Sequence, residues 1–98
     1  MLDILTIFTR ANDDRWALLP IRSTAPCEWL GFRLWRVDDR GVPIRRKGLA
    51  DGRARLLLGW NGERLAFSEC SQWLCGVATD MAPEVLAWLR ANVPKRTD

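Results

Sequence analysis

The residues with the most reactive side chains in this sequence are three cysteines, Cys27, Cys70 and Cys75. The chain contains no histidine and no tyrosine. Catalytic arrangements that need an imidazole, such as Ser-His-Asp triads and Cys-His dyads, are therefore excluded. Three cysteines without a histidine also cannot supply the four ligands of a structural zinc site within one chain. We therefore expect a protein that is not an enzyme and that holds no metal and no cofactor.

The cysteines also indicate where the protein works. Cys70 and Cys75 could approach each other in a turn, but free cysteine commonly behaves as a small buried hydrophobe. An odd number of cysteines, with no signal-peptide pattern, favours reduced thiols and a cytoplasmic location. No apolar stretch approaches the roughly 20 residues of a membrane span, so we expect no membrane partner. The 13 arginines against 2 lysines are typical of a GC-rich genome and suggest a bacterial protein. A small domain with six tryptophans is typical of accessory proteins of mobile elements.

The adjacent carboxylates of Asp38 and Asp39 resemble a metal-binding or general-acid pair. Adjacent residues at the end of a strand point to opposite faces, and aspartate is favoured in turns. We therefore assign this pair to a turn. The sequence contains no phosphate-binding loop, no dinucleotide-binding motif and no calcium-binding loop.

Positive charge is concentrated in the middle of the chain. The formal net charge is +3, but residues 33–64 hold nine basic and four acidic residues, a net charge of +5. Such a segment suits a partner with phosphates or an acidic protein. It is equally typical of a solvated strand surface in an arginine-rich protein, because +5 is modest beside dedicated nucleic-acid-binding domains.

The chain is long enough for a single domain, residues 1–98, and 48% of its residues are hydrophobic. Short apolar runs between turn residues predict strands at residues 2–9, 15–22, 28–37, 42–47, 53–60 and 63–69. The first run is apolar on both faces, as in a central strand, whereas Pro20 places the second at an edge or ends it there. We therefore expect an α+β fold: a curved antiparallel sheet of about five strands with one C-terminal helix packed on one face.

The pair Asn61-Gly62 is a strong signal for a two-residue turn and predicts a β-hairpin of defined register. In that register Leu58 faces Leu65. Facing residues share one side of the sheet, and the sides alternate along each strand. The side that must be core is then formed by Leu56, Leu58, Leu65 and Phe67.

The C-terminal helix is predicted to begin at Thr79 or Asp80, because either residue can cap it and Pro83 then lies in its first turn. It should end just before Pro94. Residues 71–78 are ambiguous and form either a short helix or an irregular segment. The helix stripe that packs on the sheet is expected to comprise Ala82, Val85, Leu86, Leu89 and Val93.

Trp88 lies outside that stripe, on the same flank as Met81. Two environments are open to its ring. Residues 71–78 can fold back and cover it, which we favour because their apolar side chains also need burial. Alternatively, the ring is exposed in a contact between molecules.

One helix leaves the second face of the sheet open. That face is expected to present basic and aromatic residues: Trp29, Arg33, Trp35, Arg53, Arg55, Leu57 and Arg64. Tryptophan and arginine are enriched in binding hot spots, so we expect a non-catalytic module that binds another protein, or a second copy of itself, through this face. Binding of single-stranded or structured nucleic acid is the alternative. A third possibility is purely structural: the sheet closes into a small barrel that buries these tryptophans.

Overall fold

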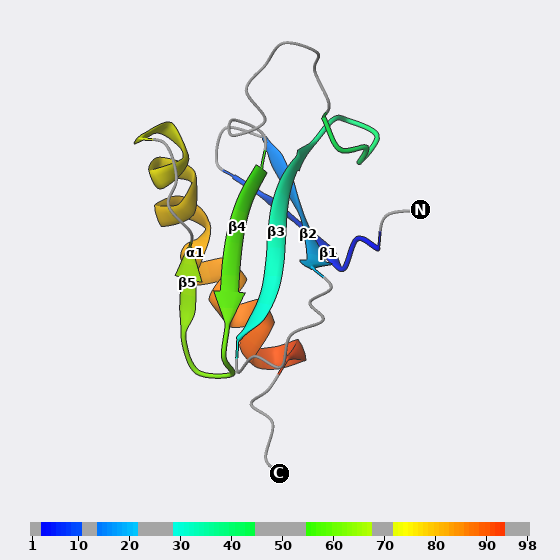
Figure 1. Ribbon diagram of the computed structural model, residues 1–98. Coiled ribbons are helices and arrows are strands. Elements are labelled where there is room, and N and C mark those ends of the chain that lie inside the picture. Colours follow the sequence, from blue (N-terminus) through cyan, green and yellow to red (C-terminus); the bar gives the residue numbers. More distant parts are fainter. Residues whose placement is uncertain (1–2, 11–13, 22–28, 45–54, 68–71, 94–98) are drawn as a thin grey trace.

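The computed structural model of the chain describes residues 3–10, 14–21, 29–44, 55–67 and 72–93, and the side chains of residues 55 and 72–75 lie outside this description. Five strands form one antiparallel sheet, and a single long helix crosses one face of it (Figure 1). The elements are β1 (Thr6–Thr9), β2 (Arg15–Ile21), β3 (Leu30–Val37), β4 (Arg55–Trp60), β5 (Leu65–Phe67) and α1 (Gln72–Asn92). The predicted α+β fold is confirmed. The sheet is open, with β1 and β5 at its edges.

The strands lie in the sheet in their sequence order, so β1 is an edge strand and not the central strand predicted. β2 lies inside the sheet, although Pro20 suggested an edge. The carbonyl of Leu18 accepts the N–H of Leu5 on the β1 side at 2.8 Å. Pro20, two residues further along β2, directs its backbone to that same side, beyond the end of β1. No neighbouring strand therefore requires the N–H that proline lacks.

The β4–β5 hairpin has a register two residues away from the predicted one. Leu58 pairs with Phe67 rather than with Leu65. The side-chain oxygen of Asn61 accepts the backbone N–H groups of Glu63 at 2.9 Å and Arg64 at 2.6 Å, so the turn is centred on Gly62 and Glu63. Gly62 has a φ of 95°, which glycine adopts without strain. A shift of two residues keeps every side chain on its side of the sheet, and Leu56, Leu58, Leu65 and Phe67 still face the helix.

The main core lies between this face of the sheet and α1. The sheet contributes Phe8, Trp16, Leu18, Phe32, Leu34, Leu56, Leu58 and Trp60, and the helix contributes Val77, Ala78, Met81, Val85 and Leu89. Trp16 and Trp60 are fully buried, and a buried indole needs a partner for its N–H. The indole of Trp60 donates to the carbonyl of Val93 at 2.6 Å, which ties the end of the helix region to β4.

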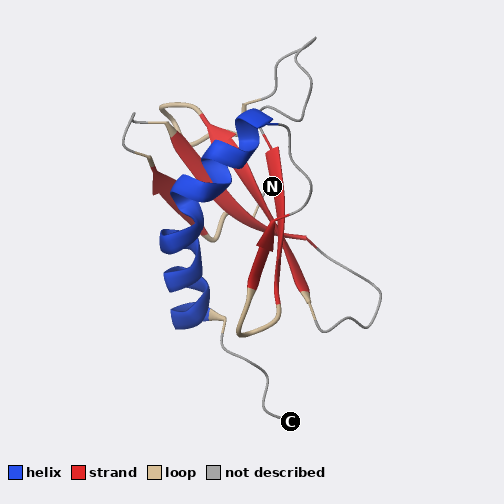
Figure 2. Ribbon diagram, turned by 90° about the vertical axis from the view of Figure 1, so that its left-hand side faces the viewer, coloured by secondary structure: helices blue, strands red, loops and turns tan. Residues whose placement is uncertain are grey.

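The helix begins at Gln72, well before the predicted start at Thr79 or Asp80. Pro83 lies inside the helix rather than in its first turn, and Figure 2 shows α1 bending along its length. Proline removes one hydrogen bond of the helical ladder and bends the helix. Burial of Val77 and Ala78 against the sheet stabilises the additional turns, which an isolated helix signal could not reveal.

The buried stripe of α1 is rotated from the predicted one towards Met81. Met81 is buried, whereas Ala82 and Leu86 are only partly covered. Because residues 72–78 continue the helix, they do not fold back over Trp88, and that expectation is wrong. Trp88 instead packs, half-buried, against the main core.

Candidate functional site

The side of the sheet turned away from α1 is here called the helix-free face. Its side chains alternate along each strand with those of the main core, and the strand registers align them in rows across the sheet. The face comprises Ile7, Thr9, Arg15, Ala17, Leu19, Ile21, Gly31, Arg33, Trp35, Val37, Leu57, Gly59 and Ala66.

Trp35 was predicted to be presented on this face, and that expectation is wrong. The residue is only 5% exposed and forms a second buried cluster with Ala17, Leu19 and Val37, onto which Ile4 packs. Its indole N–H donates to the carbonyl of Ile44 at 3.1 Å. The ring therefore stabilises the sheet by packing within this cluster on the helix-free face, and it offers no exposed surface for binding.

The segment after β3 turns back and covers part of the helix-free face. The N–H of Asp38 donates to the carbonyl of Val42 at 2.9 Å, and Pro43 forms an isolated β-bridge with Val37. The predicted strand over 42–47 is reduced to this bridge, and residues 45–47 lie outside the described residues. At Gly41, where φ is 79°, an added Cβ would lie 3.7 Å from Cδ1 of Ile7. The turn thus lies over β1 as well as beside β3.

Several large apolar side chains remain exposed on this side. Ile7 is 39% exposed and Leu57 is 43% exposed. Trp29 precedes β3 and is 37% exposed. An added Cβ at Gly59 would come within 3.3 Å of its ring, so the absence of a side chain at this position lets the Trp29 ring lie on the helix-free face.

Arg33 lies on β3, directly opposite Leu57 of β4, and is half-buried. Its guanidinium carbon is 5.7 Å from the centroid of the Trp35 ring, within the range of a cation–π interaction. On β2, Arg15 donates from its guanidinium to the carbonyl of Asp38 at 2.8 Å. The two arginines thus lie on either side of the buried Trp35 cluster, and each is in contact with a neighbouring group.

The structure brings together only part of the predicted set. Arg33 and Trp35 lie two residues apart on β3, and the backbone of Arg55 pairs with Trp35 from β4. The side chain of Arg55 and the whole of Arg53 lie outside the described residues. Arg64 is exposed in the β4–β5 turn, one residue before β5 begins, so it belongs to the rim and not to the face.

Charge is segregated between the strands and the rest of the molecule. The five strands carry four arginines, Arg15, Arg33, Arg36 and Arg55, and no aspartate or glutamate. Acidic residues adjoin the strands at Asp14, directly before β2, and at Asp38 and Asp39, in the turn after β3. The carboxylate of Asp38 accepts the N–H groups of Val42 and Arg40 at 2.9 and 2.8 Å, and these backbone hydrogen bonds lower the pKa of Asp38 from its usual value. The Asp38-Asp39 pair thus has the turn role expected from the sequence.

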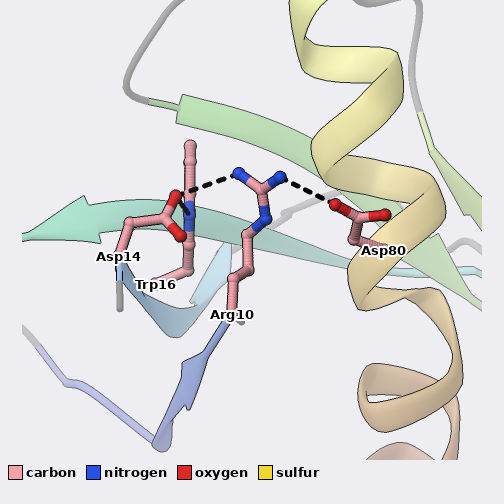
Figure 3. Close-up of polar contacts among 4 residues, drawn as sticks. All are labelled: Arg10, Asp14, Trp16 and Asp80. Carbon is pink, nitrogen blue, oxygen red and sulfur yellow. Dashed lines mark hydrogen bonds and ion pairs between the residues drawn. The ribbon is translucent and has the colours of Figure 1, made fainter. Parts of the chain in front are cut away.

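A second polar cluster joins the β1–β2 hairpin to α1 (Figure 3). The guanidinium of Arg10 lies between two carboxylates, donating to Asp14 at 3.0 Å and to Asp80 at 2.7 Å. The same oxygen of Asp14 accepts the indole N–H of Trp16 at 3.0 Å. The hydrogen bond to Asp80 is the main cause that raises the pKa of Arg10 above its usual value, so its charge is permanent.

This cluster was not anticipated from the sequence. Arg10 and Asp14 flank the first turn and pair across it, which a hairpin between the first two strands could have suggested. Asp80 lies 70 residues from Arg10, and no local pattern connects them. The side chain of Asp14 is 5% exposed and that of Asp80 is 58% exposed, so one carboxylate is inside the fold and the other is at the surface. The arrangement fastens the helix to the sheet.

Within the described parts of the chain, no group of three or more histidine, cysteine, aspartate or glutamate residues is placed to hold a metal ion. Over the same residues, α1 is the sole helix, and it lacks the apolar length needed to cross a membrane.

Comparison with known proteins adds no family to this description. No protein-family model matches the chain, and no curated protein or solved structure matches it.

Proposed function

We propose that this protein is a non-catalytic module that binds another protein through the helix-free face. The observation that carries the proposal is the exposure of Ile7, Leu57 and Trp29 on one side of the sheet, around a half-buried arginine. Apolar and aromatic contacts beside an arginine are typical of interface cores. The reducing cytoplasm, inferred from the odd number of cysteines, is the compartment we propose for it.

The buried cluster beneath this surface supports the proposal. Trp35 is held by its hydrogen bond to Ile44 and by packing with Leu19 and Val37. The exposed side chains therefore project from a rigid platform. A rigid surface loses little conformational entropy on association, which favours affinity.

The charges favour a different protein over a second copy of this chain. Among the described side chains of the helix-free face, the charged ones are those of Arg15 and Arg33. Two copies packed through this face would bring these positive charges together, and the described part of the face offers no carboxylate to compensate them. Of the two partners expected from the sequence, another protein is the one that we retain.

Nucleic acid is less well supported, although the arginines suit phosphates. Binding of single strands relies on bases stacking on open aromatic rings. The ring of Trp35 is buried, and the ring of Trp29, which is 37% exposed, has one side against Gly59, so the described part of this face offers a single ring for stacking. The exposed residues Ile7 and Leu57 are aliphatic and offer no stacking surface.

The proposal is tested by placing a photo-crosslinking amino acid at position 57 in the cells that make the protein. We expect a crosslinked protein of defined mass from position 57. The matched control is position 87, an exposed alanine on α1, from which this product should be absent. A nuclease-sensitive product would indicate nucleic acid, and a product of twice the chain mass would indicate a homodimer. Equal crosslinking from both positions, or none from position 57, would contradict the proposal.

A further inference from the structure

We infer that the segment of the partner that docks on the helix-free face is acidic and apolar, with carboxylates that pair with the arginines around Trp35. This inference rests on the proposed function and names the chemistry of the partner. Its carrying observation is that the charged side chains described on this face, Arg15 and Arg33, are both arginines and are bordered by exposed aliphatic side chains.

Arg33 is the residue on which a carboxylate would act most strongly. It is half-buried, and its guanidinium lies near the Trp35 ring. Within the described residues the ion pairs are Arg10 with Asp14 and with Asp80, so no acid of this part of the chain neutralises Arg33. A partly desolvated guanidinium that lies 5.7 Å from the centroid of a ring has planar, forked N–H donors that suit a bidentate contact with a carboxylate.

The neighbours of Arg33 define what must accompany that carboxylate. On one side of Arg33, its cross-strand partner on β4 is Leu57, which is exposed. On the other side, its partner on β2 is Leu19, which is buried. Cross-strand neighbours are about 5 Å apart. A docking segment therefore places an acidic side chain on Arg33 and an apolar one on Leu57 within one residue or two of each other.

Carboxylate is favoured over phosphate because the surface next to the charge is aliphatic. Ile7 and Leu57 give apolar contact to a protein side chain, but they cannot stack on a base. Nearby Asp39 is exposed in the turn after β3 and would repel either anion, so it does not discriminate between them.

The experiment uses three labelled probes of the same length: an eight-residue peptide of alternating glutamate and valine, its lysine–valine counterpart, and an eight-nucleotide thymidine strand. Binding to the full chain is followed by fluorescence anisotropy. We expect the acidic peptide to bind and its affinity to fall as salt rises from about 50 to 300 mM. The lysine peptide should not bind, and the thymidine strand should bind more weakly than the acidic peptide.

The variants separate this inference from the proposed function. Arg33→Gln should weaken the acidic peptide by about tenfold or more, as expected for a lost charge-assisted contact. Arg33→Lys keeps the charge without the planar fork and should give an intermediate loss. Arg90→Gln, at an exposed position on α1, is the matched control and should leave affinity unchanged. Circular dichroism shows whether each variant is folded.

Equal binding of the acidic and basic peptides, or full affinity in folded Arg33→Gln and Arg33→Lys variants, would overturn the inference. Tighter binding of the thymidine strand would also overturn it and assign the arginines to phosphate. Either result leaves the crosslink at position 57 to decide the proposed function independently. If position 57 yields a protein crosslink while Arg33 proves irrelevant, the protein binds a partner by apolar contact alone.

Discussion

The two faces of this sheet are built from the same five strands, yet they are buried in different ways. The helix-covered face is closed by α1, a helix of 21 residues, and contains Trp16 and Trp60. On the helix-free face the buried cluster is small, with Ile4 and the turn after β3 among the groups that contact it. Trp16 and Trp60 on the covered face and Trp35 on the helix-free face are almost completely buried, and each donates its indole N–H to an oxygen of the protein.

The difference lies at the margins of the faces. On the covered side, the partly buried residues Leu65, Phe67 and Leu86 still pack against the core, and Leu30, at the start of β3, is the large apolar residue exposed there among those described. On the other side, Ile7 and Leu57 are left substantially exposed beside the small cluster. A single helix is enough to complete one core, and the second face keeps a rigid centre with an uncovered apolar margin. That combination is what makes the helix-free face, and not the helix, the candidate binding surface.

The largest predicted effect compares two adjacent leucines on β4. Leu58→Lys places a charge in the main core and should cost more than about 4 kcal/mol, enough to unfold a domain of this size. Leu57→Lys, on the exposed side, should change stability by about 0.5 kcal/mol. Thermal and urea unfolding of both variants measure the difference. If the two variants lose equal stability, Leu57 is as buried as Leu58 and the helix-free face is a second closed core. The proposal of an exposed docking surface on that face would then be wrong.

The next effect concerns the polar cluster that joins the sheet to the helix. Arg10→Met leaves the buried carboxylate of Asp14 without its cation, and we expect a loss of about 3 kcal/mol in urea unfolding. Asp80→Ala removes the exposed partner and should cost less than about 1 kcal/mol. Equal losses would mean that the attachment of α1, rather than the buried charge, carries the energy of this cluster.

The covered face was largely predictable because its pattern is local. Alternation of Leu56, Leu58, Leu65 and Phe67 identifies the core side in any register shifted by an even number of residues. The turn centre was not predictable. Asn61 was expected to be one of the two central residues of the turn, but it precedes the centre, and its side-chain oxygen accepts the backbone N–H groups of Glu63 and Arg64. The long helix was missed because Pro83 is a usual sign of a first turn, and burial of earlier residues outweighed it.

The helix-free face was less predictable because its burial depends on distant segments. The sequence places Trp35 and Arg33 on one side of β3, and the structure agrees on that side. Whether a ring on that side is open depends on the turn that follows β3, whose path no periodicity describes. Exposure of Ile7 likewise follows from the edge position of β1, which its apolar composition did not suggest.

A smaller effect is expected from the hydrogen bond of Trp35. Trp35→Phe retains an aromatic ring but removes the donor to Ile44, and we expect a loss of about 1–2 kcal/mol. It should also weaken any ligand that contacts Arg33, because the ring that orients the guanidinium is smaller. Unfolding in urea and anisotropy with the glutamate–valine peptide report the two effects. A variant as stable as the parent would show that the turn after β3 is held by other contacts.

The smallest effect tests that turn directly through Asp38. Backbone N–H groups of Val42 and Arg40 lower the pKa of Asp38 below its usual value of 3.8, so the ionised carboxylate favours the folded turn. The contribution is therefore present above the usual pKa and is lost as pH falls through the lowered pKa of the folded state. At neutral pH, Asp38→Ala should speed hydrogen exchange of the Trp35 indole N–H, measured by NMR, while leaving that of Trp60 unchanged. The difference between variant and parent should disappear once the pH lies below the pKa of the folded state. If both indoles exchange faster in Asp38→Ala, the turn stabilises the whole sheet, and the two faces are not independent.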